Sequence, residues 1–145
     1  MKLTYNFEIN APVGKAFEFV NDSDKLKLWM KGLEKIEVIS ENDSDNPVGT
    51  KFRQHIRKGG KILHYDGEIL EYNYPNLLGV MIESDMFSIH TTYNFESVEK
   101  VTKVFYESDI NFKKRAAGFI GKMLVWSVKR TLVKQMKVLK KAAEE

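Results

Sequence analysis

The sequence predicts an α+β domain in which an antiparallel sheet of about seven strands curves around a long C-terminal helix. Two changes in the period of the apolar residues predict this order. Alternation over the first ten residues gives way to two short helical stretches, and strand-like alternation then runs from about residue 35 to residue 112. From Lys113 onward the apolar residues recur at helical spacing. A curved sheet and one long helix can bury their apolar faces against each other.

The N-terminal segment predicts one strand followed by two short helices. Apolar and polar side chains alternate from Leu3 to Ile9, as in a half-buried strand. Pro12 suits the first position of a helix. The run Asn21-Asp22-Ser23-Asp24 supplies capping residues for the second helix, which is expected to end near Gly32. The apolar members of this second helix are Leu26, Leu28, Trp29 and Leu33.

Six further strands are expected between residues 35 and 112. Short polar turns separate them, including the pair Gly59-Gly60 and the tripeptide Tyr74-Pro75-Asn76. Short turns between successive strands predict an antiparallel meander, and no linker or repeat divides residues 1–145, so one domain is expected. The expected strands are Lys35–Glu41, Thr50–Lys58, Lys61–Tyr72, Leu77–Glu83, Phe87–Phe95 and Val101–Phe112.

The expected C-terminal helix is strongly basic. Lys113–Glu145 has ten Lys or Arg and two carboxylates, whereas the preceding residues have thirteen basic and eighteen acidic side chains. The resulting net charges of +8 and −5 indicate either a domain closed by a basic helix or a body with a tail that binds membranes or nucleic acid. A continuous apolar stripe favours the closing helix, and no nucleic-acid partner is expected. The stripe contains Ala117, Leu124, Val125, Val128, Leu132, Met136, Leu139 and Ala143.

Composition narrows the classes of protein further. No apolar segment is long enough to cross a bilayer, and the first residues contain no signal-peptide core, so a cytoplasmic protein is expected. The absence of cysteine excludes disulfides and thiolate metal sites. Aromatic residues make up 12% of the chain, which is more than a small core needs and would suit the lining of a pocket.

Four segments, in this order, resemble a known superfamily across the whole chain. They are Asn10–Phe17 after the first strand, Trp29 in the second short helix, Val48–Phe52 at the start of a strand, and Glu68–Asn76 leading into a turn. Together they resemble the helix-grip fold of the START-related superfamily, also called SRPBCC. Its members include the birch-pollen allergens, the lipid-transfer START domains and the polyketide cyclase/dehydrase-like branch.

The resemblance implies a deep apolar cavity between the sheet and the long helix. A carrier or sensor of a lipid, polyketide or similar hydrophobic molecule is the leading hypothesis. The alternatives are an enzyme resembling polyketide cyclases and dehydratases, and a protein-interaction domain of the chaperone-activator type. No cofactor is expected. The ligand-binding residues expected are Trp29, Tyr65, Ile69, Met81, Gly118, Gly121, Leu124 and Val125.

Two features of the early C-terminal helix remain open to more than one interpretation. Gly118 and Gly121 each cost roughly 1 kcal/mol of helix propensity relative to Ala, so they either leave room for a ligand or allow close packing on the sheet. Phe119, Met123 and Trp126 lie beside basic residues on another face. That face forms a second core contact, a dimer contact or a peripheral membrane contact. A monomer or weak homodimer is expected.

Candidates for catalysis gather on one strand pair. His55 and the pair His64 and Glu68 come close if the strands flanking Gly59-Gly60 form a hairpin, and His90 could join them. The simpler interpretation is a solvated, charged sheet face, with Leu63, Tyr65 and Ile69 pointing inward. No metal site is expected, because the three histidines lack metal-ligand spacing, and no nucleophile elbow is present.

Overall fold

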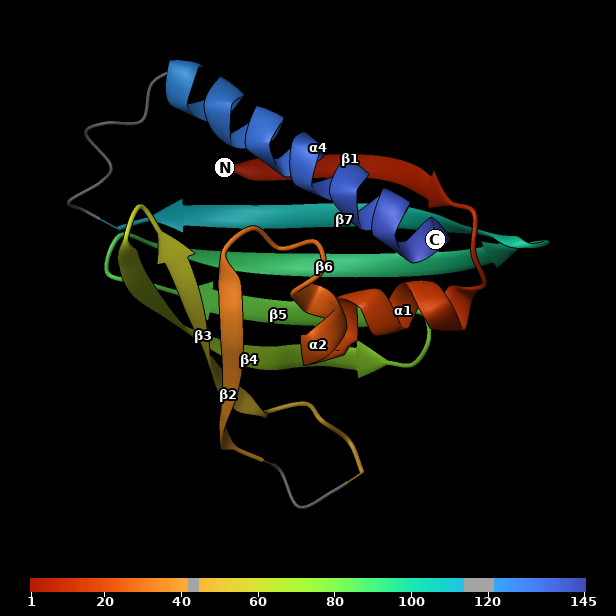
Figure 1. The fold of residues 1–145 in the computed structure, drawn as a ribbon, viewed down its shortest axis with the longest axis horizontal. Coiled ribbons are helices and arrows are strands. Elements are labelled where there is room, and N and C mark those ends of the chain that lie inside the picture. The colour runs from red at the N-terminus through yellow and green to blue at the C-terminus, as the bar shows by residue number, and fades with distance from the viewer. Residues whose placement is uncertain (42–44, 114–121) are drawn as a thin grey trace.

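The computed structural model describes residues 1–41, 45–113 and 122–145. The seven strands of these residues form one antiparallel sheet (Figure 1). The strand order is β1-β7-β6-β5-β4-β3-β2. Each strand from β2 to β6 pairs with the next one along the chain, as the short turns predict. Strand β1 joins the free edge of β7. The strands are β1 Lys2–Ile9, β2 Leu33–Ser40, β3 Lys51–Lys58, β4 Lys61–Asn73, β5 Leu77–Glu83, β6 Phe87–Val98 and β7 Val101–Phe112.

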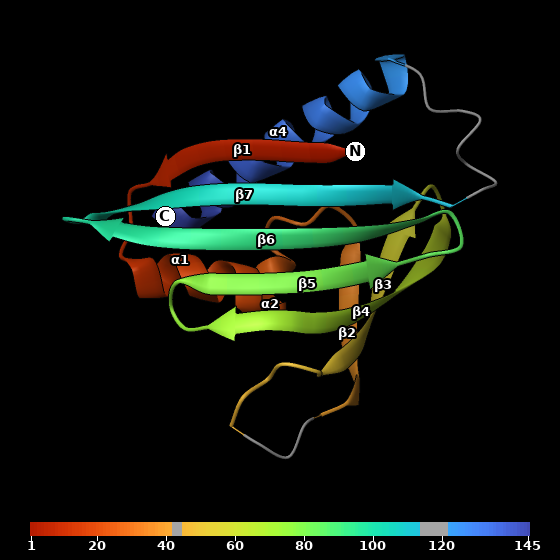
Figure 2. The ribbon, with the colours of Figure 1, turned by 180° about the vertical axis from the view of Figure 1, so that it is seen from behind.

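Helices α1 (Val13–Asn21), α2 (Ser23–Leu26) and α4 (Lys122–Glu144) lie on one face of this sheet. Figure 2, seen from behind, shows the sheet in front and these helices beyond it. The predicted helix-grip arrangement is therefore confirmed. Residues 114–121, which the sequence assigns to the start of the long helix, lie outside the described residues.

The hairpin between β3 and β4 turns as its two glycines predict. Gly59 and Gly60 have φ angles of 57° and 83°, which L side chains rarely adopt and which match the right-handed twist of the flanking strands. The turn fixes the pairing register, so that Gln54 lies opposite Tyr65 and His55 opposite His64. A slip of one residue would exchange the two faces of both strands.

The second short helix is shorter than the sequence predicts. Asp22 caps it, accepting a hydrogen bond from the Asp24 amide at 2.9 Å, but α2 ends at Leu26 and a turn follows. Leu28 is therefore 64% exposed rather than part of an apolar helix face. Gly32, with φ of 84°, sits against the backbone of Arg57, where a side chain would have no space.

Helix α4 closes the domain through the predicted apolar stripe. Leu132, Met136, Leu139 and Ala143 are all buried and pack in one cluster with Phe17 of α1 and with the inner face of the sheet. Polar contacts hold the end of the helix against the corner between β1 and α1. Lys140 donates to the carbonyl oxygen of Glu8 at 2.7 Å, and the Asn10 amide donates to the Glu144 carboxylate at 2.7 Å.

Candidate ligand-binding site

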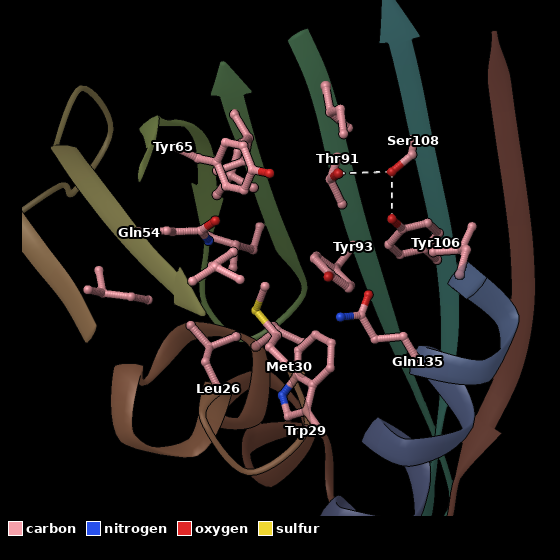
Figure 3. A pocket seen from close by; sticks show the side chains of 18 of the residues that line it. Leu26, Trp29, Met30, Gln54, Tyr65, Thr91, Tyr93, Tyr106, Ser108 and Gln135 are labelled. Carbon is pink, nitrogen blue, oxygen red and sulfur yellow. Dashed lines mark hydrogen bonds between the residues drawn. The ribbon is translucent and has the colours of Figure 1, made fainter. Parts of the chain in front are cut away.

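A cavity of about 590 Å³ lies between the sheet and the helices (Figure 3). All seven strands contribute to its lining, and α1, α2 and α4 cover it. This volume falls within the range of roughly 300–1,000 Å³ that holds drug-sized ligands in proteins. The closing helix thus leaves open space over part of the sheet while it packs tightly over another part.

Strand periodicity determines which side chains face this cavity. Val80 and Ile82 of β5 line it, as do Thr91 and Tyr93 of β6. The residues between them point to the opposite face, because successive side chains of a strand alternate. Gly67 lies on the inner face of β4 and leaves the space that the Phe52 ring occupies, since a Cβ at residue 67 would collide with that ring.

The described part of the cavity lining contains no Asp, Glu, Lys, Arg or His. Most of its side chains are aliphatic or aromatic, and the polar ones are hydroxyls and amides. A buried charge without a partner carries a large desolvation penalty. The lining is therefore suited to a neutral, largely apolar molecule.

Three hydroxyls form a hydrogen-bonded chain on one wall. The Ser108 Oγ lies 2.6 Å from the Tyr106 hydroxyl and 2.9 Å from the Thr91 Oγ1, and all three residues are buried (Figure 3). Burial raises the pKa of Tyr106, and its hydrogen bonds to Ser108 and Thr91 partly offset that rise. Hydroxyls both donate and accept hydrogen bonds, so the chain gives this wall of the cavity an uncharged polar character.

Other polar side chains face the cavity without a hydrogen-bond partner among the described residues. Gln54 and Tyr93 are both more than nine-tenths buried. Figure 3 shows the Gln54 amide and the Gln135 amide of α4 extending into the cavity from opposite sides. Burial, and secondarily the neighbouring Tyr106, raises the pKa of Tyr93 well above its ordinary value, so its hydroxyl remains protonated at neutral pH.

Trp29 forms part of the cavity wall beside the short helices. Its indole Nε1 donates to the carbonyl oxygen of Phe19 at 2.7 Å, and the side chain is buried. The hydrogen bond fixes the ring orientation and joins the segment after α2 to α1. Met30 and Leu26 flank the ring and also face the cavity (Figure 3).

Of the eight expected ligand-binding residues, three line the cavity, one does not, and four fall outside the description. Trp29, Tyr65 and Ile69 line the cavity. Met81 was expected there, but that prediction is wrong: Val80 and Ile82 line the cavity, and Met81 therefore points to the opposite face. The remaining predictions lie outside the description, which leaves out residues Gly118 and Gly121 and the side chains of Leu124 and Val125.

The four candidates for catalysis all lie on the face of the sheet opposite the cavity. Each of them adjoins a cavity-lining residue along its strand and is itself absent from the described lining. His55 Nε2 lies 3.2 Å from a Glu37 oxygen, and its ring meets that of His64 edge-on at 4.6 Å. His90 Nε2 lies 2.7 Å from a Glu71 oxygen. These positions agree with a charged outer surface, and Glu68 faces the same way, opposite Lys51 in the pairing of β3 with β4.

The structure narrows the three interpretations of the helix face that contains Trp126. A second core contact does not hold at this residue, because Trp126 is 62% exposed. The Arg130 guanidinium lies over its ring at 5.3 Å from the centroid, which is a cation–π contact. Lys129, Lys134 and Lys137 border the same shallow pocket. Phe119 and the Met123 side chain are not among the described parts.

Sequence reasoning did not select Gln54, Thr91, Tyr93, Tyr106 or Ser108 as site residues. One signal was available for the hydroxyl chain. Tyr106 and Ser108 are two residues apart on one face of a strand, and the turn at Glu99-Lys100 sets the β6–β7 register that brings Thr91 opposite Ser108. No comparable signal marks Gln54 or Tyr93, because both sit in ordinary alternating patterns.

The described residues contain no cluster of three or more His, Asp or Glu side chains arranged to hold a metal ion. Among the same residues, no helix is long and apolar enough to span a membrane.

Solved structures share the arrangement of the sheet and helices seen in this chain. The START superfamily protein from Mycobacterium smegmatis has a TM-score of 0.79 at 16% identity, with 99% of this chain and 97% of that one covered. The Zhui aromatase/cyclase from Streptomyces sp. R1128 gives 0.75 at 14% identity over 99% and 93%. The Aha1 protein from Colwellia psychrerythraea, solved as a dimer, gives 0.72 at 16% over 99% and 96%. At these identities the likeness shows the helix-grip fold alone.

The family of the chain follows from its sequence. The chain belongs to the family described as polyketide cyclase / dehydrase and lipid transport, whose model matches residues 1–144. No curated protein matches the chain.

Proposed function

We propose that this protein binds a hydrophobic small molecule in the cavity between sheet and helices, as a carrier or sensor. The observation that carries the proposal is the cavity of about 590 Å³, whose described lining holds no charged side chain. Membership of a family described by both cyclase activity and lipid transport supports it. Trp29, Tyr65 and Ile69 are the proposed contacts to the apolar part of the ligand.

An enzymatic role of the cyclase or dehydratase type has weaker support. A general base works best with a pKa near the operating pH. Tyrosines are the titratable side chains of the described lining, and burial raises the pKa of Tyr93 and of Tyr106, which moves both away from neutrality. The histidines and Glu68 lie on the other face of the sheet. Binding without turnover therefore fits this cavity better.

Native mass spectrometry of protein freshly purified from cells tests the proposal. We expect a bound hydrophobic molecule, and its addition to stripped protein should raise the melting temperature, because a ligand at 100 times its Kd stabilises the folded state by about 2.7 kcal/mol. The absence of any bound molecule, together with no melting shift across a panel of lipids and polyketides, would refute the proposal.

The exposed face of α4 supports a peripheral contact with an anionic bilayer. Trp126 is largely exposed, and Lys129, Arg130, Lys134 and Lys137 surround it. Basic residues beside an exposed Trp suit the interface of an anionic membrane. Sedimentation with vesicles should show binding that grows with phosphatidylserine content, falls with salt and weakens in Trp126→Ala. Binding that ignores both lipid charge and salt would contradict this contact.

A further inference from the structure

The polar side chains in the cavity call for a particular ligand chemistry. Gln54 and Tyr93 are more than nine-tenths buried, and neither side chain has a hydrogen-bond partner among the described residues. Among the described residues, every side-chain nitrogen or oxygen that is fully enclosed has a hydrogen-bond partner. The free amide and hydroxyl must therefore border the open space of the cavity, where a ligand can reach them.

Tyr93 lies beside the hydroxyl chain, whereas Gln54 faces the cavity from β3 on the other side (Figure 3). Tyr93 packs against Tyr106, with ring centroids 5.2 Å apart, and Tyr106 leads through Ser108 to Thr91. Figure 3 shows the Gln135 amide reaching toward the same region from α4. The cavity thus offers hydrogen-bond donors and acceptors in two places, beside the hydroxyl chain and at Gln54, while the rest of the described lining is mostly apolar.

We propose that the cavity selects an uncharged ligand bearing a carbonyl or hydroxyl oxygen, and that Tyr93 and Gln54 determine this selectivity. The proposal rests on the binding function above and adds the chemistry of the ligand. A pure hydrocarbon would leave both polar groups unpaired once it displaced water from them. An ionised carboxylate would be buried without a cation in the described lining.

Decane, 2-decanone and decanoate form a matched set of probes with equal chain length. Tryptophan emission can report their binding, because the chain has two tryptophans and Trp126→Phe leaves Trp29 in the cavity wall as the sole emitter. We expect the ketone to bind about tenfold more tightly than the alkane, since a site built for a polar group rejects the analogue that lacks it. Decanoate should bind at least about a hundredfold more weakly than the ketone at pH 7.5, where roughly one carboxyl in a thousand is protonated.

Two conservative variants connect this selectivity to the named residues. At least one of Tyr93→Phe and Gln54→Met should weaken ketone binding by about fivefold or more, while both leave decane binding unchanged or tighter. Tyr74→Phe is the matched control, because Tyr74 is exposed and does not line the cavity. Melting temperatures within a few degrees of the wild type would show that all three variants are folded.

The outcomes separate this inference from the proposed function. Equal binding of decane and 2-decanone, or decanoate binding as tightly as the ketone, overturns the inference and leaves the hydrophobic carrier in place. Unchanged ketone affinity in both Tyr93→Phe and Gln54→Met overturns the assigned residues. If none of the three probes, nor any member of the wider lipid panel, binds the folded protein, the proposed function and the inference both fail.

Discussion

Two identical substitutions, one in the cavity wall and one in the core, should have opposite effects on stability. Val80 lines the cavity from β5 and pairs with Ile69 and Thr91, which also line it. Val104 of β7 faces the same side of the sheet but is completely buried and lies outside the described cavity lining. Val80→Phe places a ring into open space, whereas Val104→Phe forces one into packed core.

The two substitutions should change the free energy of unfolding in opposite directions. Overpacking at Val104 should cost about 1–3 kcal/mol. In Val80→Phe, burying about 50 Å² of added ring surface is worth about 1.3 kcal/mol. A change of 1 kcal/mol shifts the melting temperature by roughly 2–4 °C in a chain of about this size. Val104→Phe should therefore melt about 2–12 °C lower, while Val80→Phe melts at or slightly above the wild-type temperature.

Thermal unfolding followed by circular dichroism, together with a 2-decanone titration, measures both effects. Val80→Phe should lose about tenfold or more in ligand affinity because its ring occupies ligand space. If Val80→Phe destabilises the protein as much as Val104→Phe does, the space beside Val80 is not open and the reasoning is wrong. Unchanged ketone affinity in a stable Val80→Phe variant would place the ligand elsewhere.

Two further predictions concern the closing helix and the buried tyrosines. Leu139 is fully buried, so Leu139→Ala should reduce the free energy of unfolding in urea by about 2–5 kcal/mol. The neighbouring Val138 is 44% exposed, and Val138→Ala should change that free energy by less than about 0.5 kcal/mol. Equal effects of the two variants would contradict the packing of α4. Burial raises the pKa of Tyr93 and Tyr106 in the folded protein, so above about pH 10 both tyrosines ionise more readily in the unfolded chain and the free energy of unfolding should fall. Tyr93→Phe should reduce this fall, as measured by unfolding curves at alkaline pH. An identical pH profile in the variant would show that Tyr93 ionises as easily in the folded state.

The sequence predicts the sheet well because turns and alternation determine register locally. Gly59-Gly60 sets the β3–β4 pairing, and with it the faces of Gln54, Tyr65 and Ile69. The buried half of the C-terminal helix follows from its apolar stripe in the same way, from Leu132 to Ala143. Here each local pattern has one arrangement that buries its apolar residues.

The site is predicted less well where local patterns leave the direction of a side chain open. Val80, Met81 and Ile82 form a continuous apolar run, so alternation alone does not show that Met81 points away from the cavity. Trp126 lies on another face of the helix than the apolar stripe, and periodicity alone does not show whether a second surface covers that face. Gln54 and Tyr93 become conspicuous only when tertiary structure buries them beside an open space.

Methyl NMR during a 2-decanone titration tests the central claim most directly, because it locates the ligand in the folded protein. Ile56, Val80 and Ile89 line the cavity, whereas Ile9 and Val104 are buried outside its described lining. We predict that the methyl signals of the first three residues shift progressively and saturate together, while those of Ile9 and Val104 remain nearly unchanged. Saturable ketone binding with no shift at Ile56, Val80 or Ile89 would contradict the assignment of this cavity as the ligand site.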